Sequence, residues 1–275
     1  MTGAEFYTYL QQKYDKAYSA YLDASKANRL IKETMYRVID RMYHDLSFEK
    51  EGDELIGLII KDKSLTPSAG ICILNASITS PTPPANELPY YMHIMRVLAK
   101  YETAFIVSAS SSNTLTSVQH TLRKGDIVKN GVTLYTVTKV YNDTFVARTT
   151  AGVYATATGT YYKVFDREMK QMSSNRKAGS FHNANIVTPR YEFLNNGTSQ
   201  NRSLKLTPSP VTALVDYVRV PPLDIDVANT STELLEYYSQ KFLYLLMDEC
   251  VMNFATQTKD QATRQMAMQD VINNP

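Results

Sequence analysis

The four histidines are the residues best suited to bind a metal ion or to transfer a proton. His44, His93, His120 and His182 stand singly along the chain. Two imidazoles reach one metal ion when they lie four residues apart on a helix or close together in a short loop, and no pair here has that spacing. We therefore expect no metal ligand among them.

A second group of candidate residues is acidic and comprises Glu49, Glu51, Asp53 and Glu54. Clustered carboxylates can hold Mg²⁺ or supply an acid and a base. This cluster lies beside Lys50 at the junction of two expected helices, where carboxylates in a first turn favour the helix N-terminus. We interpret it as a solvated corner rather than a site.

Motifs for nucleophilic catalysis and for phosphate binding are also missing. The chain has no Gly-x-Ser-x-Gly elbow, and the serine-rich segment 108–112 is typical of a solvated loop. Segments 124–126 and 129–131 are isolated glycine turns, whereas a phosphate-cradling loop needs several amides that converge on one anion. These residues predict no catalytic, cofactor or metal site, and they favour a protein that is not an enzyme.

The overall charge and hydropathy restrict the possible partners. The chain of 275 residues has 29 basic and 27 acidic side chains, which give a formal charge of +2. This charge does not indicate a large basic surface for nucleic acid, although a local basic patch is compatible with it. No apolar run approaches the roughly 20 residues that cross a bilayer, and the N-terminus lacks a secretory signal. We expect a soluble globular protein of one large or two small domains, with no membrane partner.

The two cysteines bear on the compartment. Cys72 and Cys250 are far apart in the sequence, and both have apolar neighbours. We expect buried free thiols rather than a disulfide. Such thiols favour a reducing compartment.

Tyrosine dominates the aromatic residues, with 20 Tyr against 9 Phe and no Trp, and seven of the tyrosines lie in the first 45 residues. A tyrosine buries an apolar ring and keeps a polar tip, which suits a surface that is wet in the free subunit and covered in an assembly. The alternative is an amphipathic helix whose core stripe contains tyrosine.

The first hundred residues have mainly helical patterns. Segment 4–51 contains no Pro and no Gly, and its apolar spacing predicts one long helix or a hairpin broken near 23–28. A short helix is expected at 54–61, and an extended proline-rich loop at 75–89. Asn86 then caps a helix that runs to about Tyr101. One face of this helix holds Met92, Met95 and Leu98.

From 103 to 165 the apolar period changes to two, which indicates short antiparallel strands. The expected strands are 104–108, 127–129, 133–140, 144–149, 153–156 and 160–164. The expected turns are 130–131, 142–143, 151–152 and 158–159. Closely spaced strands with tight turns predict a small antiparallel barrel or curled sheet.

The last part of the chain returns to helices after a second set of strands. A polar hinge at 172–183 leads to strands at 186–194, 203–206 and 212–220, with a turn at 196–197. Thr230 and Glu233 have the spacing of a capping box, which predicts the start of a helix. A polar helix is expected from about Lys259.

These elements predict an α+β fold. N- and C-terminal helices form a helical scaffold, into which a small antiparallel β-barrel or sheet and a second short β-hairpin region are inserted. The expected division is a helical region with a Pro-rich loop at 1–102, the β insert at 103–166, the hinge and second strand set at 167–229, and a C-terminal helical region at 230–275.

The β insert also has a nucleic-acid interpretation, because small barrels bind single strands through surface aromatics and a basic groove. The residues that interleave these two types are Tyr135, Lys139, Tyr141, Phe145, Arg148, Tyr161, Tyr162 and Lys163. The alternative is that alternate aromatics fill the barrel while the basic residues form its wet face.

Two blocks of the sequence carry a family resemblance. The first contains Glu5-Phe6-Tyr7, Tyr14-Asp15-Lys16-Ala17-Tyr18, Lys26-Ala27-Asn28-Arg29-Leu30-Ile31-Lys32 and Asp53-Glu54-Leu55. The second contains Thr207-Pro208-Ser209-Pro210-Val211, Asp216-Tyr217-Val218-Arg219-Val220-Pro221-Pro222 and Glu233-Leu234-Leu235. In layout the chain resembles the head-to-tail connector, or neck ring, proteins of tailed phages, particularly the crAss-like phages of gut Bacteroidota.

This resemblance implies a virion protein of the phage neck or tail that is assembled in the bacterial cytoplasm. Such proteins form a homo-oligomeric ring, often of about twelve copies, below the portal protein and next to other connector or tail rings. Double-stranded DNA passes through the channel without sequence specificity. The family has no catalytic residues to carry over, and its mechanism is binding.

The resemblance and the composition together nominate interface residues. Tyr14, Tyr18 and Tyr21 belong to the tyrosine-rich N-terminal arm. Two proline-stiffened segments are candidate docking arms, since prolines reduce the entropy lost on ordering. Their residues are Pro83, Pro84, Tyr217, Arg219, Pro221, Pro222 and Asp224.

Overall fold

The structure is a computed structural model, and it describes residues 1–13, 22–45, 53–75, 83–118, 120–171, 188–195 and 201–257. The chain divides into two compact units. Met1–Ile60 together with Tyr217–Pro275 forms the helical unit, and Lys61–Asp216 forms the β unit.

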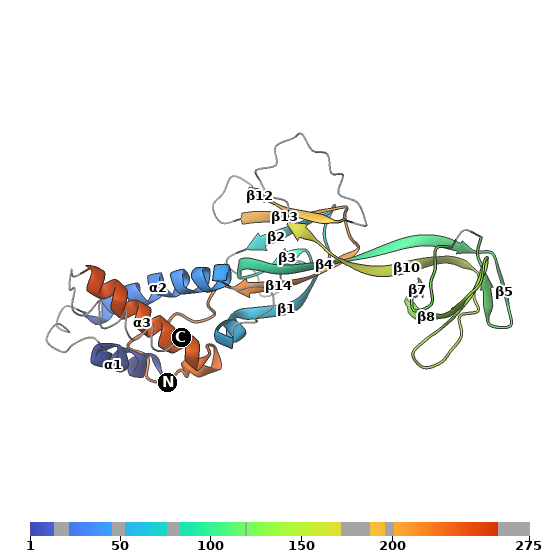
Figure 1. Cartoon of the computed structure of the whole chain (residues 1–275). Coiled ribbons are helices and arrows are strands. Elements are labelled where there is room, and N and C mark those ends of the chain that lie inside the picture. Colours follow the sequence, from blue (N-terminus) through green and yellow to red (C-terminus); the bar gives the residue numbers. More distant parts are fainter. Residues whose placement is uncertain are drawn as a thin grey trace. The chain divides into compact units, whose positions relative to one another are not determined.

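The fold is mostly β, so the prediction of a helical scaffold with a small inserted barrel is wrong. The described residues contain a nine-stranded sheet, a five-stranded sheet and three α-helices (Figure 1). The helices are α1 (Gly3–Lys13), α2 (Ala24–Asp45) and α3 (Gln240–Gln257). Strands begin at Ile59 rather than at 103, so the β region is far larger than an insert.

The nine-stranded sheet has the order β1-β14-β4-β10-β7-β8-β9-β6-β5. Its strands are β1 (Ile59–Leu65), β4 (Tyr91–Val107), β5 (Ala109–Ser111), β6 (Thr114–Thr116), β7 (Ile127–Asn130), β8 (Thr133–Val140), β9 (Thr144–Arg148), β10 (Gly159–Glu168) and β14 (Thr212–Arg219). The five-stranded sheet has the order β11-β12-β13-β2-β3. Its strands are β2 (Ile71–Asn75), β3 (Glu87–Leu88), β11 (Lys170–Gln171), β12 (Arg190–Asn195) and β13 (Asn201–Thr207).

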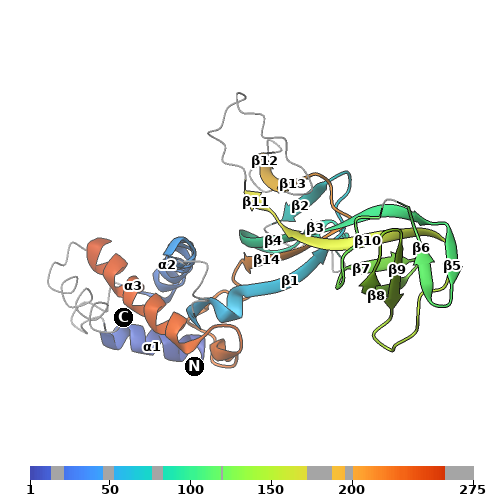
Figure 2. The ribbon, with the colours of Figure 1, turned by 45° about the vertical axis from the view of Figure 1, so that its right-hand side comes forward.

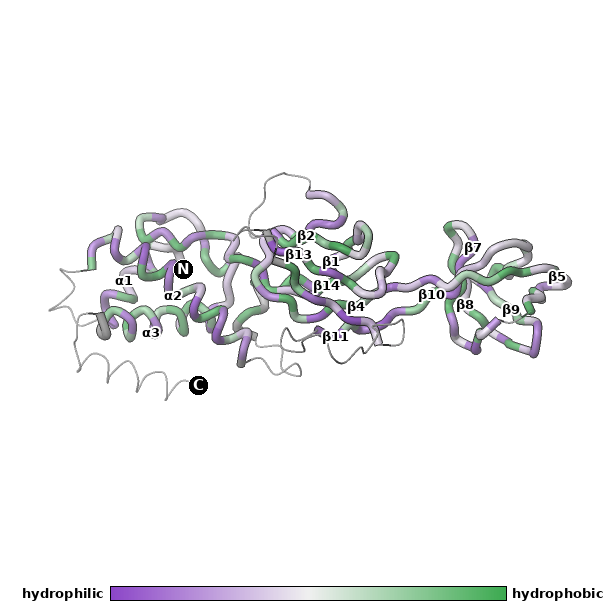
Figure 3. Tube along the Cα trace, turned by 90° about the horizontal axis from the view of Figure 1, so that it is seen from above, coloured by the Kyte–Doolittle hydropathy of each residue, from purple (hydrophilic) through white to green (hydrophobic). Residues whose placement is uncertain are grey.

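The helical unit is held together by apolar residues at helical spacing. Hydrophobic residues recur along α3 (Figure 3), and α3 packs against α2. The buried side chains of this packing include Ile31, Met35, Ile39, Phe242, Leu246 and Cys250. Asp23 begins α2 by accepting a 2.8 Å hydrogen bond from the Lys26 amide, which favours the predicted hairpin over one continuous helix.

The start of α3 differs from its prediction. Gln240 is the first residue of the helix, and the Ser239 hydroxyl caps it by accepting a 3.1 Å hydrogen bond from the Phe242 amide. The Glu233 carboxylate pairs instead with the N-terminal ammonium of Met1. The predicted capping box at Thr230 and Glu233 is therefore wrong, because the chain makes a short 3₁₀ turn at Leu234–Glu236 before the helix begins.

Two predicted helices are strands or 3₁₀ structure. The segment expected to be a helix at 54–61 is a 3₁₀ helix over Asp53–Leu58 that continues into β1. The segment 86–101 lies in β3 and β4 instead of a helix. Tyr90 has φ of 52°, outside the helical region, and the buried residues Val97, Ala99 and Tyr101 alternate as in a strand.

The long strands β4 and β10 form an antiparallel ribbon that leads from the centre of the sheet to its far end (Figures 1 and 2). The pairing runs from Glu168 opposite Leu98 to Gly159 opposite Val107. The 17 residues of β4 span about 55 Å. We call β5 to β9, with the adjoining ends of β4 and β10, the distal sheet.

The distal sheet has its own hydrophobic core. Phe145 and Tyr161 are completely buried in it and meet edge to face, with ring centroids 6.4 Å apart. Its other buried members are Val107, Leu115, Leu122, Val128, Val137, Ala147 and Ala155. This core closes the curled end of the sheet without help from the other strands.

Much of the predicted strand pattern after 103 is confirmed. Strands β7 and β8 cover the predicted 127–129 and 133–140, and β9 covers all but the last residue of 144–149. The β7–β8 hairpin turns at Gly131 and Val132, one residue later than expected, and Gly131 has φ of 58° as a type II′ turn requires. Segment 153–156 is not a strand and makes only an isolated bridge between Tyr154 and Arg148.

The later predicted elements are confirmed in part. Strand β13 contains the predicted 203–206, β14 matches 212–220 closely, and β12 covers the end of 186–194. The polar hinge at 172–183, the turn at 196–197 and the polar helix from Lys259 lie outside the described residues.

The core of the distal sheet gives a stability prediction. Phe145→Ala should lower the free energy of opening of the distal sheet by about 3 to 5 kcal/mol, since a fully buried ring leaves a cavity. Native-state hydrogen exchange of the β8 and β9 amides measures this opening. Tyr141→Ala, at a side chain 56% exposed, is the control and should change it by less than about 0.5 kcal/mol. Equal effects of the two variants would show that the core is not formed as described.

Candidate interaction surface

The strand register determines which side chains share a face of the distal sheet. Tyr161 lies opposite Phe105 on β4, and Lys163 lies opposite Val128 on β7. Val128 in turn lies opposite Tyr135 on β8. Because alternate residues of a strand point the same way, these side chains all belong to one side, which we call the inner face. The core of the distal sheet lies on this face.

The other side of the same four strands, which we call the outer face, is apolar and open to solvent. Ile106, Ile127, Leu134 and Tyr162 all point to it, because each is one residue from an inner-face residue in the register. Ile106 is 70% exposed and Leu134 is 54% exposed. Tyr162 and Leu134 are both opposite Lys129, so the three side chains form one row across the strands, with the lysine between the two apolar residues.

The apolar exposure is concentrated in the distal sheet and its loops. Nine of the fourteen large hydrophobic side chains found exposed among the described residues lie here. They are Ile106, Val118, Ile127, Val132, Leu134, Tyr141, Val153, Tyr154 and Tyr162. Single exposed apolar residues are ordinary, but a contiguous cluster marks a binding surface.

Three charged side chains lie on the outer face: Lys129 stands between Tyr162 and Leu134, Glu102 lies opposite Val164, and the exposed Arg148 lies opposite Thr136. Lys129 and Glu102 form a 2.8 Å ion pair on this side of the sheet. This pair adds no net charge to the apolar row of Tyr162 and Leu134. The outer face is therefore a mixed surface of exposed apolar side chains, one ion pair and one arginine, a composition that is common at protein interfaces.

The predicted interface residues are placed as follows. Tyr14, Tyr18 and Tyr21 lie outside the described residues. In the β unit, Pro83 is half-buried and Pro84 is exposed. The prediction that this proline segment docks onto a neighbour stays a prediction.

The predicted arm from Tyr217 to Asp224 packs within its own unit. Tyr217 is buried, with 4% exposure, and the Arg219 guanidinium donates a 3.2 Å hydrogen bond to the carbonyl oxygen of Gly57. Asp224 is exposed and forms a 2.7 Å ion pair with Lys32. Pro221 is half-buried, and Pro222 is exposed. These contacts bind the segment to the helices, so only Pro222 and Asp224 present an open surface.

The residues of the nucleic-acid interpretation separate into two groups. Phe145 and Tyr161 are buried in the core of the distal sheet, and the half-buried Tyr135 packs against them. None of these three rings is available to stack on a base. The exposed members are Lys139, Tyr141, Arg148 and Tyr162, while Lys163 is half-buried and forms an ion pair with Asp126.

The buried thiols have no chemical activation. Burial raises the pKa of the Cys72 thiol to about 12 and that of the Cys250 thiol to about 12. Both cysteines are free and buried, as the sequence predicts. In the described part of the chain, no group of three or more His, Cys, Asp or Glu side chains could hold a metal ion. The acidic side chains at 49–54 lie outside the described ones.

Comparisons with known proteins give no relative. The sequence matches no protein-family model and no curated protein, and no solved structure matches the fold. Over the described residues, no helix is long and apolar enough to cross a bilayer. The arrangement of exposed side chains is therefore the basis for the function proposed below.

The thiols give a reactivity prediction. Cys72 and Cys250 should resist iodoacetamide at pH 8 in the native protein, because the thiolate is the reactive form and their pKa lies far above this pH. Both should react in urea, as mass spectrometry can show. The variant Val132→Cys, at a side chain 96% exposed, should react in the native state. Rapid native-state modification of the unmodified sequence would contradict the burial.

The outer face predicts a change in dye binding. Ile106→Ser combined with Leu134→Ser should lower the fluorescence of bound anilinonaphthalene sulfonate while it leaves thermal stability nearly unchanged, because both side chains are already exposed. Val211→Ser, at a side chain 47% exposed outside the distal sheet, is the matched control. Equal dye fluorescence in all three proteins would mean that the outer face is not a coherent apolar surface.

Proposed function

We propose that the chain is a virion structural protein, a ring-forming subunit of a phage head-to-tail connector that links the portal to the tail and lines or seals the DNA channel. The observation that carries the proposal is the apolar outer face of the distal sheet. A protein whose work is assembly keeps such a surface open until a neighbour covers it. The sequence layout described above supports the choice of a connector among assembling proteins.

The long ribbon of β4 and β10 suits this role. It carries the outer face away from β1 and β14, which lie at the opposite edge of the same sheet. A projecting sheet can therefore reach a neighbouring subunit. Stable interfaces bury about 800 Å² on each partner, so the exposed hairpin tip at Val132 and the nearby tyrosines would add to the outer face.

The contact between copies would be head to tail. In a closed ring, the outer face of one subunit meets a different surface of the next, and the rotation between copies closes the ring. Burial of each large apolar side chain contributes roughly 1.5 to 3 kcal/mol before the costs of association are subtracted. Four such side chains, Ile106, Ile127, Leu134 and Tyr162, give each contact a modest strength that a ring multiplies.

The alternative function, nucleic-acid binding by the β insert at 103–166, has less support. A single-strand groove needs several exposed rings beside basic residues. Phe145 and Tyr161 fill the distal core, and Tyr162 shares its face with Leu134 and Ile127. The exposed aromatics belong to an apolar protein-binding surface more readily than to a basic groove.

The proposal predicts assembly. The purified chain should form a large homo-oligomer, alone or with a portal ring, detected by light scattering and as rings in electron micrographs. Ile106→Asp combined with Leu134→Asp should shift the population to monomers, since charges in an apolar contact are costly to desolvate. The shift should be at least about tenfold in the assembly constant, equivalent to about 1.4 kcal/mol.

The control is Val211→Asp, which adds a charge at an exposed apolar position outside the distal sheet and should leave assembly unchanged. Circular dichroism checks that all variants are folded. A chain that stays strictly monomeric and ignores a portal ring would refute the proposal. If the outer-face variant assembles normally, the contact between copies lies on another surface.

A further inference from the structure

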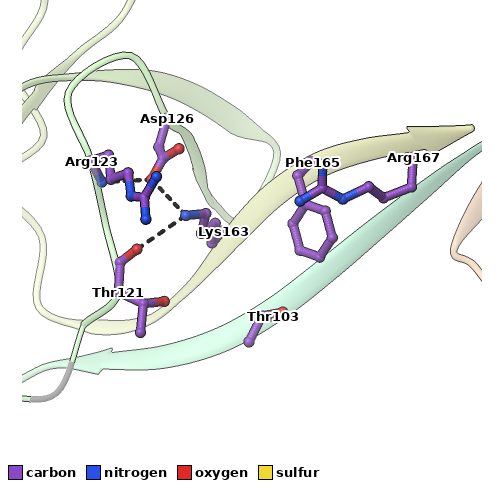
Figure 4. Close-up of a pocket in the computed structure, with 7 residues that line it drawn as sticks. All are labelled: Thr103, Thr121, Arg123, Asp126, Lys163, Phe165 and Arg167. Carbon is purple, nitrogen blue, oxygen red and sulfur yellow. Dashed lines mark hydrogen bonds and ion pairs between the residues drawn. The ribbon is translucent and has the colours of Figure 1, made fainter. Parts of the chain in front are cut away.

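A cavity of about 560 Å³ opens beside the ribbon on the inner-face side, where it meets the distal sheet. It is lined by Thr103, Thr121, Arg123, Asp126, Lys163, Phe165 and Arg167 (Figure 4). Its volume lies within the range of small-molecule sites, which is roughly 300 to 1,000 Å³. Neither the assembly surface nor the distal core uses these side chains.

The strand geometry explains why three of these residues meet. Lys163, Phe165 and Arg167 alternate along β10, so they point to the same side of the ribbon. Thr103 lies opposite Lys163 in the register with β4 and points to that side as well. One wall of the cavity is thus a regular strand, which holds its side chains in fixed positions.

The loop 121–126 forms the other wall and is tied to this strand. The Lys163 ammonium donates a 3.1 Å hydrogen bond to the Thr121 carbonyl oxygen and forms a 2.6 Å ion pair with Asp126. The same Asp126 oxygen accepts a 2.6 Å hydrogen bond from the Arg123 amide. Asp126 is therefore committed to holding the loop, and its charge is balanced by Lys163.

Two guanidinium groups remain uncompensated. Arg123 and Arg167 make no ion pair with any side chain in the described part of the chain. Arg167 lies over the Phe165 ring, 5.7 Å from its centroid. This cation–π contact holds the guanidinium near the ring and leaves its N–H groups free to bind an anion.

The two arginines stand at different ends of the cavity (Figure 4). Arg123 lies with Asp126, Lys163 and Thr121, while Arg167 lies with Phe165. A ligand that binds both arginines carries negatively charged groups that can reach each of them, such as two linked phosphates. Guanidinium forks match phosphate oxygens in particular, because they donate two parallel hydrogen bonds.

We propose that this cavity binds phosphate groups, with Arg123 and Arg167 as the two phosphate-binding side chains. The phosphates could belong to a free nucleoside diphosphate or to the backbone of a single nucleic-acid strand. Lys163 and Asp126 are positioning residues, since their ion pair holds the loop against the strand. The site does not depend on ring assembly and goes beyond the function proposed above.

The test measures binding of ADP by calorimetry and of a short labelled single-stranded oligonucleotide by fluorescence anisotropy, both at low salt. Arg123→Gln combined with Arg167→Gln should weaken binding at least about tenfold, since each arginine supplies charge-assisted hydrogen bonds. Arg148→Gln is the matched control, because Arg148 is exposed on β9 and does not line the cavity. It should bind like the unmodified protein.

The single variant Arg167→Lys gives a second readout. It keeps the charge but loses the planar fork, so its affinity should lie between those of the unmodified protein and the double variant. Circular dichroism confirms that the variants are folded, as expected for side chains without ion pairs.

The ligands distinguish the two sources of phosphate. Binding of ADP identifies a nucleotide site, and binding of the oligonucleotide alone identifies a strand site. Two results would overturn the proposal. One is the absence of binding to both ligands, and the other is equal weakening by Arg148→Gln, which would indicate diffuse electrostatic attraction.

Discussion

The antiparallel pairing of β4 with β10 determines how the rest of the β unit is arranged. It runs without interruption from Leu98 opposite Glu168 to Val107 opposite Gly159. Along it, one side of the ribbon carries first the cavity and then the buried core around Tyr161, and the other side carries Ile106 and Tyr162. A slip of one residue would exchange the two sides and would bring Thr160 and Tyr162, in place of Tyr161, to the core side. The register therefore keeps the ring of Tyr161 in the core, where it is completely buried.

The local elements after 103 could be predicted from the sequence because their signals are short-range. The tight turns near Gly131 and at 142–143 separate runs rich in β-branched residues, and the structure has strands β7, β8 and β9 there. The sequence left one long helix and a hairpin broken near 23–28 as alternatives, and the cap by Asp23 at the start of α2 favours the hairpin. The free, buried state of Cys72 and Cys250 followed from their apolar neighbours.

The fold class could not be predicted, because one segment satisfies two periods. Met92, Met95 and Leu98 recur at helical spacing, but Val97, Ala99 and Tyr101 alternate as a strand requires, and long-range pairing decides between them. The outer face was not predicted, because alternation along a strand does not show which of its apolar residues are buried and which are exposed.

The cavity had a partial signal in the alternation of Lys163, Phe165 and Arg167. The predicted strand ended at 164 and so cut this pattern in half. The approach of Arg123 depends on a loop that closes over the ribbon, and spacing along the chain does not reveal it.

Beyond Val164 the ribbon has consequences for solubility. Strand β10 pairs with β7 only over Tyr162 to Val164, so among the described residues its last part, Phe165 to Glu168, has an open backbone edge. An open edge is a template on which foreign strands add and aggregate, and charged side chains are a common protection. Asp166, Arg167 and Glu168 stand at this edge. The same arginine that faces the cavity thus belongs to a charged run of the kind that protects an open strand edge.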